Sequence, residues 1–121
     1  MKDWKDLKRF AEHCGFFVTS TTGGKHNVGS KHFRGLAIDV RTRDKTNAQI
    51  ESFMRKCSAI GVWCFDERTR PKNQKVWGGA HLHLEVKPNT SGIVREFQRK
   101  NNLQIDGIVG PKTLAALDTI N

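Results

Sequence analysis

The six residues from His81 to Val86 alternate strictly between polar and aliphatic side chains, in the order His-Leu-His-Leu-Glu-Val. Successive side chains of a β-strand point to opposite faces, so this alternation places His81, His83 and Glu85 on one face. Leu82, Leu84 and Val86 share the other face, which is predicted to be core. The segment therefore requires a sheet with one buried face and one face that looks into a cleft or into solvent.

The remaining hydrophobic periodicity predicts an α+β fold. Helices with one apolar face are expected from Asp3 to Cys14 and from Thr46 to Ile60, and Gly15 and Gly61 are expected to end them. Further short strands are expected at residues 16–20, 36–40 and 62–65, and loops at residues 21–30 and 66–74. The helices should pack on a central antiparallel or mixed sheet, in the order helix, strand, strand, helix, strand, strand.

A change of composition divides the chain. Residues 88–92 are interpreted as a linker between a domain of residues 1–87 and a short helical segment of residues 93–121. Pro111 suits the first position of that segment's second helix, because its fixed backbone angle is already helical. So short a segment cannot bury much apolar surface alone, and we expect it to pack on the first domain or on another chain.

Charge and apolar content narrow the function classes. The chain has 21 Lys and Arg against 12 Asp and Glu, a formal charge of +9 that favours anionic partners such as a bacterial cell wall. No apolar run approaches the roughly 20 residues that span a bilayer, so no membrane insertion is expected. A helix-turn-helix or RNA-binding signature is absent, and we expect no nucleic-acid partner. Because the three cysteines have no CxxC spacing, we expect them to be reduced thiols. We also expect the chain to be a monomer.

Two histidines and an aspartate form a candidate metal site. Asp39 lies in an otherwise apolar strand, where an ionised carboxylate is costly unless a cation or hydrogen-bond donors satisfy it. His32 lies in the loop that enters the same strand. Two imidazoles and one carboxylate are a common catalytic zinc set, with the fourth position open to water. The plainer reading pairs Asp39 with Arg41 or Arg43 and leaves the histidines hydrogen-bonded or solvated.

Two motifs connect these residues to a known family. Residues 30–39 read Ser-Lys-His-Phe-Arg-Gly-Leu-Ala-Ile-Asp and match the pattern SxHxxGxAxD at every specified position. His81-Leu82-His83 supplies an HxH motif downstream. Together they resemble the zinc peptidases that cut peptidoglycan stem peptides, namely D-Ala-D-Ala carboxypeptidases and dipeptidases and phage L-alanyl-D-glutamate endopeptidases. The resemblance covers roughly residues 5–87.

The resemblance implies a role for each motif residue. One Zn²⁺ would be held by His32, Asp39 and His83. His81 would be a catalytic histidine that does not bind the metal, and it would position the attacking water, take a proton or stabilise the oxyanion. Ser30 would orient a ligand or contact substrate, or else cap its own loop.

The chain departs from the family pattern at two points. Relatives often carry a carboxylate base three residues before the last histidine ligand, where this chain has Ala80. His81, Asp66 or Glu67 would then have to serve as the base. Carboxypeptidase relatives also place an arginine upstream of the first motif to hold a terminal carboxylate. No arginine lies between Arg9 and that motif, which favours an endopeptidase.

The C-terminal segment carries a second resemblance. Residues 93–117 are similar to the second half of a peptidoglycan-binding type 1 module. The hallmark residues are Phe97-Gln98, Leu103 and the run from Asp106 to Leu114. The module's first helix is missing, so the segment either binds glycan or only caps the domain.

These features together predict an endolysin-type zinc endopeptidase that hydrolyses an amide bond in peptidoglycan stem peptides. With no secretory signal at its start, the protein is expected to be made in the cytoplasm and to act at the cell wall, as phage endolysins do. Two alternatives stay open. One is a D-Ala-D-Ala carboxypeptidase or dipeptidase of the same fold, and the other is a non-catalytic, zinc-stabilised peptidoglycan-binding module.

Overall fold

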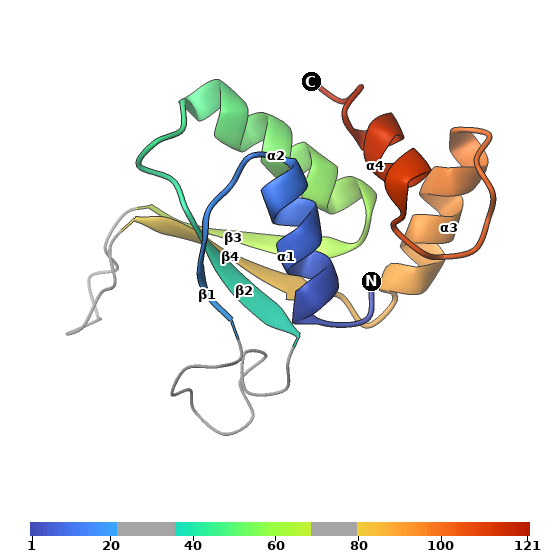
Figure 1. The fold of residues 1–121 in the computed structure, drawn as a ribbon, viewed down its shortest axis with the longest axis horizontal. Helices are drawn as coiled ribbons and strands as arrows, with labels where there is room; N and C mark the ends of the chain where they lie inside the picture. Colours follow the sequence, from blue (N-terminus) through green and yellow to red (C-terminus); the bar gives the residue numbers. More distant parts are fainter. Residues whose placement is uncertain (22–35, 69–79) are drawn as a thin grey trace.

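The computed structural model describes residues 1–21, 36–68 and 80–121. Its elements are α1 (Trp4–His13), β1 (Val18–Ser20), β2 (Ala37–Arg41), α2 (Asn47–Ala59), β3 (Val62–Glu67), β4 (His81–Val86), α3 (Thr90–Lys100) and α4 (Pro111–Leu117). Figure 1 shows α1 and α2 on one side of the sheet, with α3 and α4 beside them. The predicted α+β class and element order are confirmed.

The four strands form one antiparallel sheet in the order β1-β2-β4-β3. The two inner strands carry the alternation that the sequence predicts. Leu82, Leu84 and Val86 are buried in the core beneath the helices, whereas the polar residues of β4 are half-buried on the opposite face. We call that opposite face the polar face of the sheet; it carries Asp39, Arg41, Glu67, His81, His83 and Glu85.

Local signals fix the helix ends where the sequence predicts them. The Asp3 side chain accepts hydrogen bonds from the backbone at the start of α1. Thr46 and Gln49 form a reciprocal capping box at the start of α2. Gly61 has φ +76°, and a Cβ there would lie 2.9 Å from the Cα of Thr90. Glycine is therefore required at this position both by its left-handed conformation and by the close approach of α3.

Two of the element boundaries that differ from those predicted have a clear physical reason. β3 continues through Asp66 and Glu67, which were placed in a loop because they begin a highly charged run; both pair with β4 along the edge of the sheet. α3 begins at Thr90, inside residues 88–92 that were interpreted as linker. The Thr90 hydroxyl is buried and donates to the carbonyl of Ile60 at 2.9 Å, which ties the start of α3 to the end of α2.

The C-terminal segment packs on the first domain, as expected. Val94, Leu114 and Leu117 belong to the same core cluster as α1, α2 and the sheet. At the surface, Nε2 of His13 lies 3.0 Å from Asp118. In the described parts of the chain, no helix is long and apolar enough to cross a membrane.

Candidate metal and catalytic site

Asp39 and His83 are brought into direct contact by the pairing of β2 with β4. They are register partners on the two inner strands, and Oδ1 of Asp39 lies 2.8 Å from Nδ1 of His83. Their side chains are only 22% and 17% exposed. Two of the three predicted zinc ligands therefore meet on the polar face of the sheet, although they are far apart in the sequence.

Glu85 contacts the other ring nitrogen of His83. Its Oε1 lies 2.8 Å from Nε2, so the imidazole sits between two carboxylates. Burial lowers the pKa of His83, but the hydrogen bonds and charges of Asp39 and Glu85 outweigh it and raise the pKa above its usual value. A carboxylate on the second nitrogen is also the usual way in which proteins orient a metal-binding histidine. The sequence places Glu85 on this face, but we predicted no role for it.

His81 has a carboxylate partner of its own. It pairs across the strands with Glu67, and its Nε2 lies 2.7 Å from Oε2 of Glu67. Asp66 is the register partner of Leu82 and points to the helix side, where Arg68 donates to it at 2.8 Å and 2.7 Å. Of the two carboxylates considered as a base, only Glu67 lies on the polar face.

The donor set on this face fits zinc. A carboxylate oxygen and an imidazole nitrogen in contact are ligand types that zinc prefers, and the site is half-buried, with a carboxylate behind the histidine. His32, the third predicted ligand, and Ser30 lie outside the described residues. Within the described residues, no group of three or more His, Cys, Asp or Glu is arranged to hold a metal ion. The assignment of zinc thus stays a prediction.

Zinc affinity is expected to fall as the pH drops through the raised pKa of His83. Zinc binds the neutral imidazole, so it must displace a proton that Asp39 and Glu85 help to retain. Competition with a chromophoric chelator between about pH 5.5 and 8.5 measures this dependence. Glu85→Gln should move the midpoint to lower pH and weaken zinc binding at high pH by about 10–100-fold. Glu96→Gln, an exposed position on α3, is the control; an affinity independent of pH contradicts the assignment.

A groove of about 490 Å³ opens beside these residues. The described residues that line it are Phe17, Thr19, Ser20, Asp39, Arg41, Arg43, Ala80 and His81. It therefore runs from β1 across β2 to the start of β4 and includes one predicted ligand and the predicted catalytic histidine. Its position next to both makes it the candidate substrate groove.

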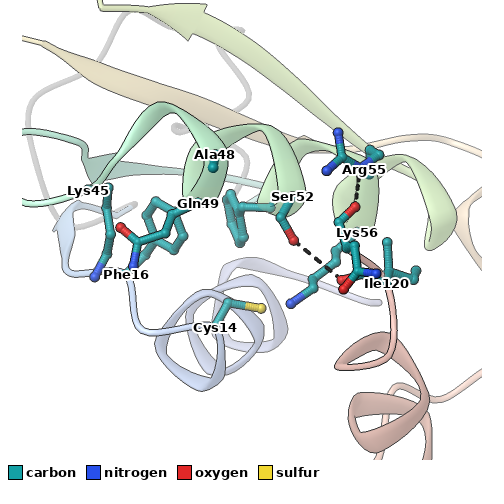
Figure 2. Close-up of a pocket in the computed structure, with 11 residues that line it drawn as sticks. Cys14, Phe16, Lys45, Ala48, Gln49, Ser52, Arg55, Lys56 and Ile120 are labelled. Carbon is teal, nitrogen blue, oxygen red and sulfur yellow. Dashed lines mark hydrogen bonds between the residues drawn. The ribbon is translucent and has the colours of Figure 1, made fainter.

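A second pocket, of about 430 Å³, lies between α1, α2 and the last residues of the chain (Figure 2). Ser52 donates to the carbonyl of Ile120 at 3.4 Å, and Arg55 donates to the carbonyl of Asn121. Cys14 faces this pocket, and burial raises the pKa of its thiol to about 11, so the thiol stays protonated at neutral pH. None of the predicted site residues that the structure describes lines this pocket.

The hallmark residues of the C-terminal segment are held together by one buried amide. The Gln98 side chain is 1% exposed. Its Nε2 lies 2.9 Å from a carboxylate oxygen of Asp106, 2.9 Å from the carbonyl oxygen of Ile108 and 3.2 Å from the hydroxyl of Thr113, so its two N–H groups are shared among three acceptors. Its Oε1 accepts from the backbone N–H groups of Asp106 and Gly107, at 3.1 and 3.0 Å. Gln98 therefore links α3 to the turn before α4, which explains why these residue types occur together.

Comparison with known proteins supports the second resemblance. Residues 85–117 match the family model PG_binding_1, described as "Putative peptidoglycan binding domain". No zinc-peptidase family was detected for residues 1–87. No curated protein and no solved structure matches the chain. The match covers α3, α4 and the end of β4, and the C-terminal segment of this chain is therefore similar to a peptidoglycan-binding domain.

Proposed function

We propose that this chain is a zinc-dependent peptidase that hydrolyses an amide bond in peptidoglycan stem peptides at the bacterial cell wall. The observation that carries the proposal is the contact of Asp39 with His83 on the polar face, beside a groove. The similarity of residues 85–117 to a peptidoglycan-binding domain supports the choice of substrate. The positive charge of the chain favours approach to an anionic wall.

In this proposal, different residues of the polar face bind the metal, orient its ligand and act on the substrate. Asp39 and His83 would hold the zinc ion together with His32, and Glu85 would fix the ring of His83. Zinc at this position would supply an activated water and a polarised scissile carbonyl. His81 lies two residues from His83 on the same face, about 7 Å along the strand, and reaches the reacting atoms from the groove.

Glu67 gives His81 the carboxylate that the chain lacks at Ala80. A carboxylate hydrogen-bonded to one ring nitrogen sets which nitrogen carries the proton and stabilises the imidazolium. His81 lines the groove, where it would serve in proton transfer or oxyanion binding. In this role Glu67 is a positioning residue that acts through His81.

Glu67→Gln is expected to lower kcat by about 10–100-fold. An amide can either donate to or accept from His81, so it no longer determines which ring nitrogen carries the proton. Asp66→Asn is the matched control, because Asp66 points to the helix side and pairs with Arg68. Rates of stem-peptide hydrolysis by wild type and the two variants at saturating substrate test this. Equal losses in the two variants would remove Glu67 from the mechanism.

The direct test of the proposed function is mass spectrometry of sacculi incubated with the full chain, with added zinc and with a chelator. New stem-peptide termini that appear only with zinc establish the peptidase and identify the bond. A chain that pellets with sacculi and leaves them intact under both conditions contradicts it.

That second outcome describes the other candidate, a non-catalytic peptidoglycan-binding module stabilised by zinc. The family match at residues 85–117 and the missing carboxylate at Ala80 favour this candidate. It predicts that chelation lowers the melting temperature without changing any product.

A further inference from the structure

We propose that Arg41 binds a free carboxylate of the ligand in the groove, on a residue next to the scissile bond. The identity of the ligand as a stem peptide rests on the proposed function. The anion site itself rests on the surroundings of Arg41.

The register of the sheet places Arg41 next to the reacting centre. Asp39 pairs with His83 and Arg41 pairs with His81, so these are consecutive pairs on the polar face, about 7 Å apart. Arg41, Asp39 and His81 all line the groove. A ligand whose scissile bond lies at Asp39 and His83 would place a neighbouring residue near Arg41.

The guanidinium group of Arg41 is held in place but has few hydrogen-bond acceptors. Its Cζ lies 4.7 Å from the centre of the Phe17 ring, which supports one face. Its Nη2 donates to Oδ2 of Asp44 at 3.5 Å, a long hydrogen bond. Its Nε is buried and has no acceptor among the residues that the structure describes. A guanidinium has five N–H donors, so the described residues use only a small part of its donor capacity, and an unsatisfied buried donor is unfavourable.

The charge of the groove also favours an anion. Arg43 lines the same groove with an exposed side chain, so the described lining residues include two cations. Asp39 is the single carboxylate among the described lining residues, and it is in contact with His83. The planar guanidinium matches the two oxygens of a carboxylate, so carboxylate is the anion that we infer. Such a group comes either from the end of a peptide or from an acidic residue linked through its side chain.

The experiment uses reduced-amide analogues of D-Ala-D-Ala and of L-Ala-D-Glu whose side-chain carboxyl is capped as an amide; neither analogue can be hydrolysed. Each is prepared with a free carboxylate and with the corresponding amide, and binding to the full chain is measured by calorimetry. For at least one analogue, the free acid should bind wild type at least about tenfold more tightly than the amide. Arg41→Ala should remove this preference, Arg41→Lys should keep part of it, and Arg9→Ala should keep all of it.

The analogue that shows the preference identifies the source of the carboxylate. Equal binding of acid and amide by wild type, or an unchanged preference in a folded Arg41→Ala, overturns the inference. Because binding is measured without turnover, the outcome is separate from the sacculus test. Carboxylate preference without cleavage would retain the anion site and reject only the peptidase.

Discussion

His83→Ala is expected to abolish zinc binding and to lower stem-peptide hydrolysis by about a thousandfold or more. The substitution removes one predicted ligand and the partner of both Asp39 and Glu85. By activating water and polarising the carbonyl, zinc lowers the activation free energy by several kcal/mol. Each 1.36 kcal/mol of activation free energy changes the rate tenfold. Metal analysis after dialysis should give about one zinc per wild-type chain and almost none for the variant.

Two further variants separate loss of metal from loss of structure. Asp39→Asn keeps a carbonyl oxygen that can accept from His83 but removes the negative charge, so it should fold and bind zinc poorly. His13→Ala is the matched control, because His13 lies on α1 and contacts Asp118, away from the polar face. If a folded His83→Ala retained zinc and activity, the assignment of the ligands would be wrong.

The fold could be predicted because its signals are local. Caps and terminal glycines mark α1 and α2, and strict alternation marks β4. The contact of Asp39 with His83 is different, because it depends on the register of two strands from distant parts of the chain. Periodicity does not determine register, so only the motif resemblance connected the two residues before the structure was known.

The partners of the two histidines were largely missed for a related reason. In the sequence, Glu67 belongs to a charged run, and such runs are typical of loops. In the structure, the edge strand β3 extends to Glu67. Once Glu67 is in a strand, its face follows from the alternation with Asp66. Glu85 was already on the polar face, yet only coordinates show that it contacts His83. Arg41 and Arg43 were considered only as partners of Asp39, whereas the structure places them along the groove.

Gln98→Leu is expected to destabilise the chain by about 2 kcal/mol, a large fraction of the stability of a domain of this size. Leucine has a similar volume, so the core stays filled, but it can satisfy none of the groups that Gln98 pairs. The N–H groups of Asp106 and Gly107 would lose the acceptor that Gln98 provides, and the Thr113 hydroxyl, in a buried residue, would lose a donor. Each unsatisfied buried group costs about 1–3 kcal/mol, and urea unfolding of the two proteins measures the sum.

Gln104→Leu is the matched control, because Gln104 is exposed in the same segment and should change stability by less than about 0.5 kcal/mol. Val94, Leu114 and Leu117 share the core with α1 and α2, so loosening the turn before α4 should lower the stability of the whole chain in a single transition. A separate early transition for the C-terminal segment would mean that it folds as an independent unit.

Sacculus pelleting at low urea then relates this packing to wall binding. Gln98→Leu should pellet less than Gln104→Leu if α3 and α4 carry the affinity for the wall. Equal pelleting would assign that affinity to the groove on the sheet.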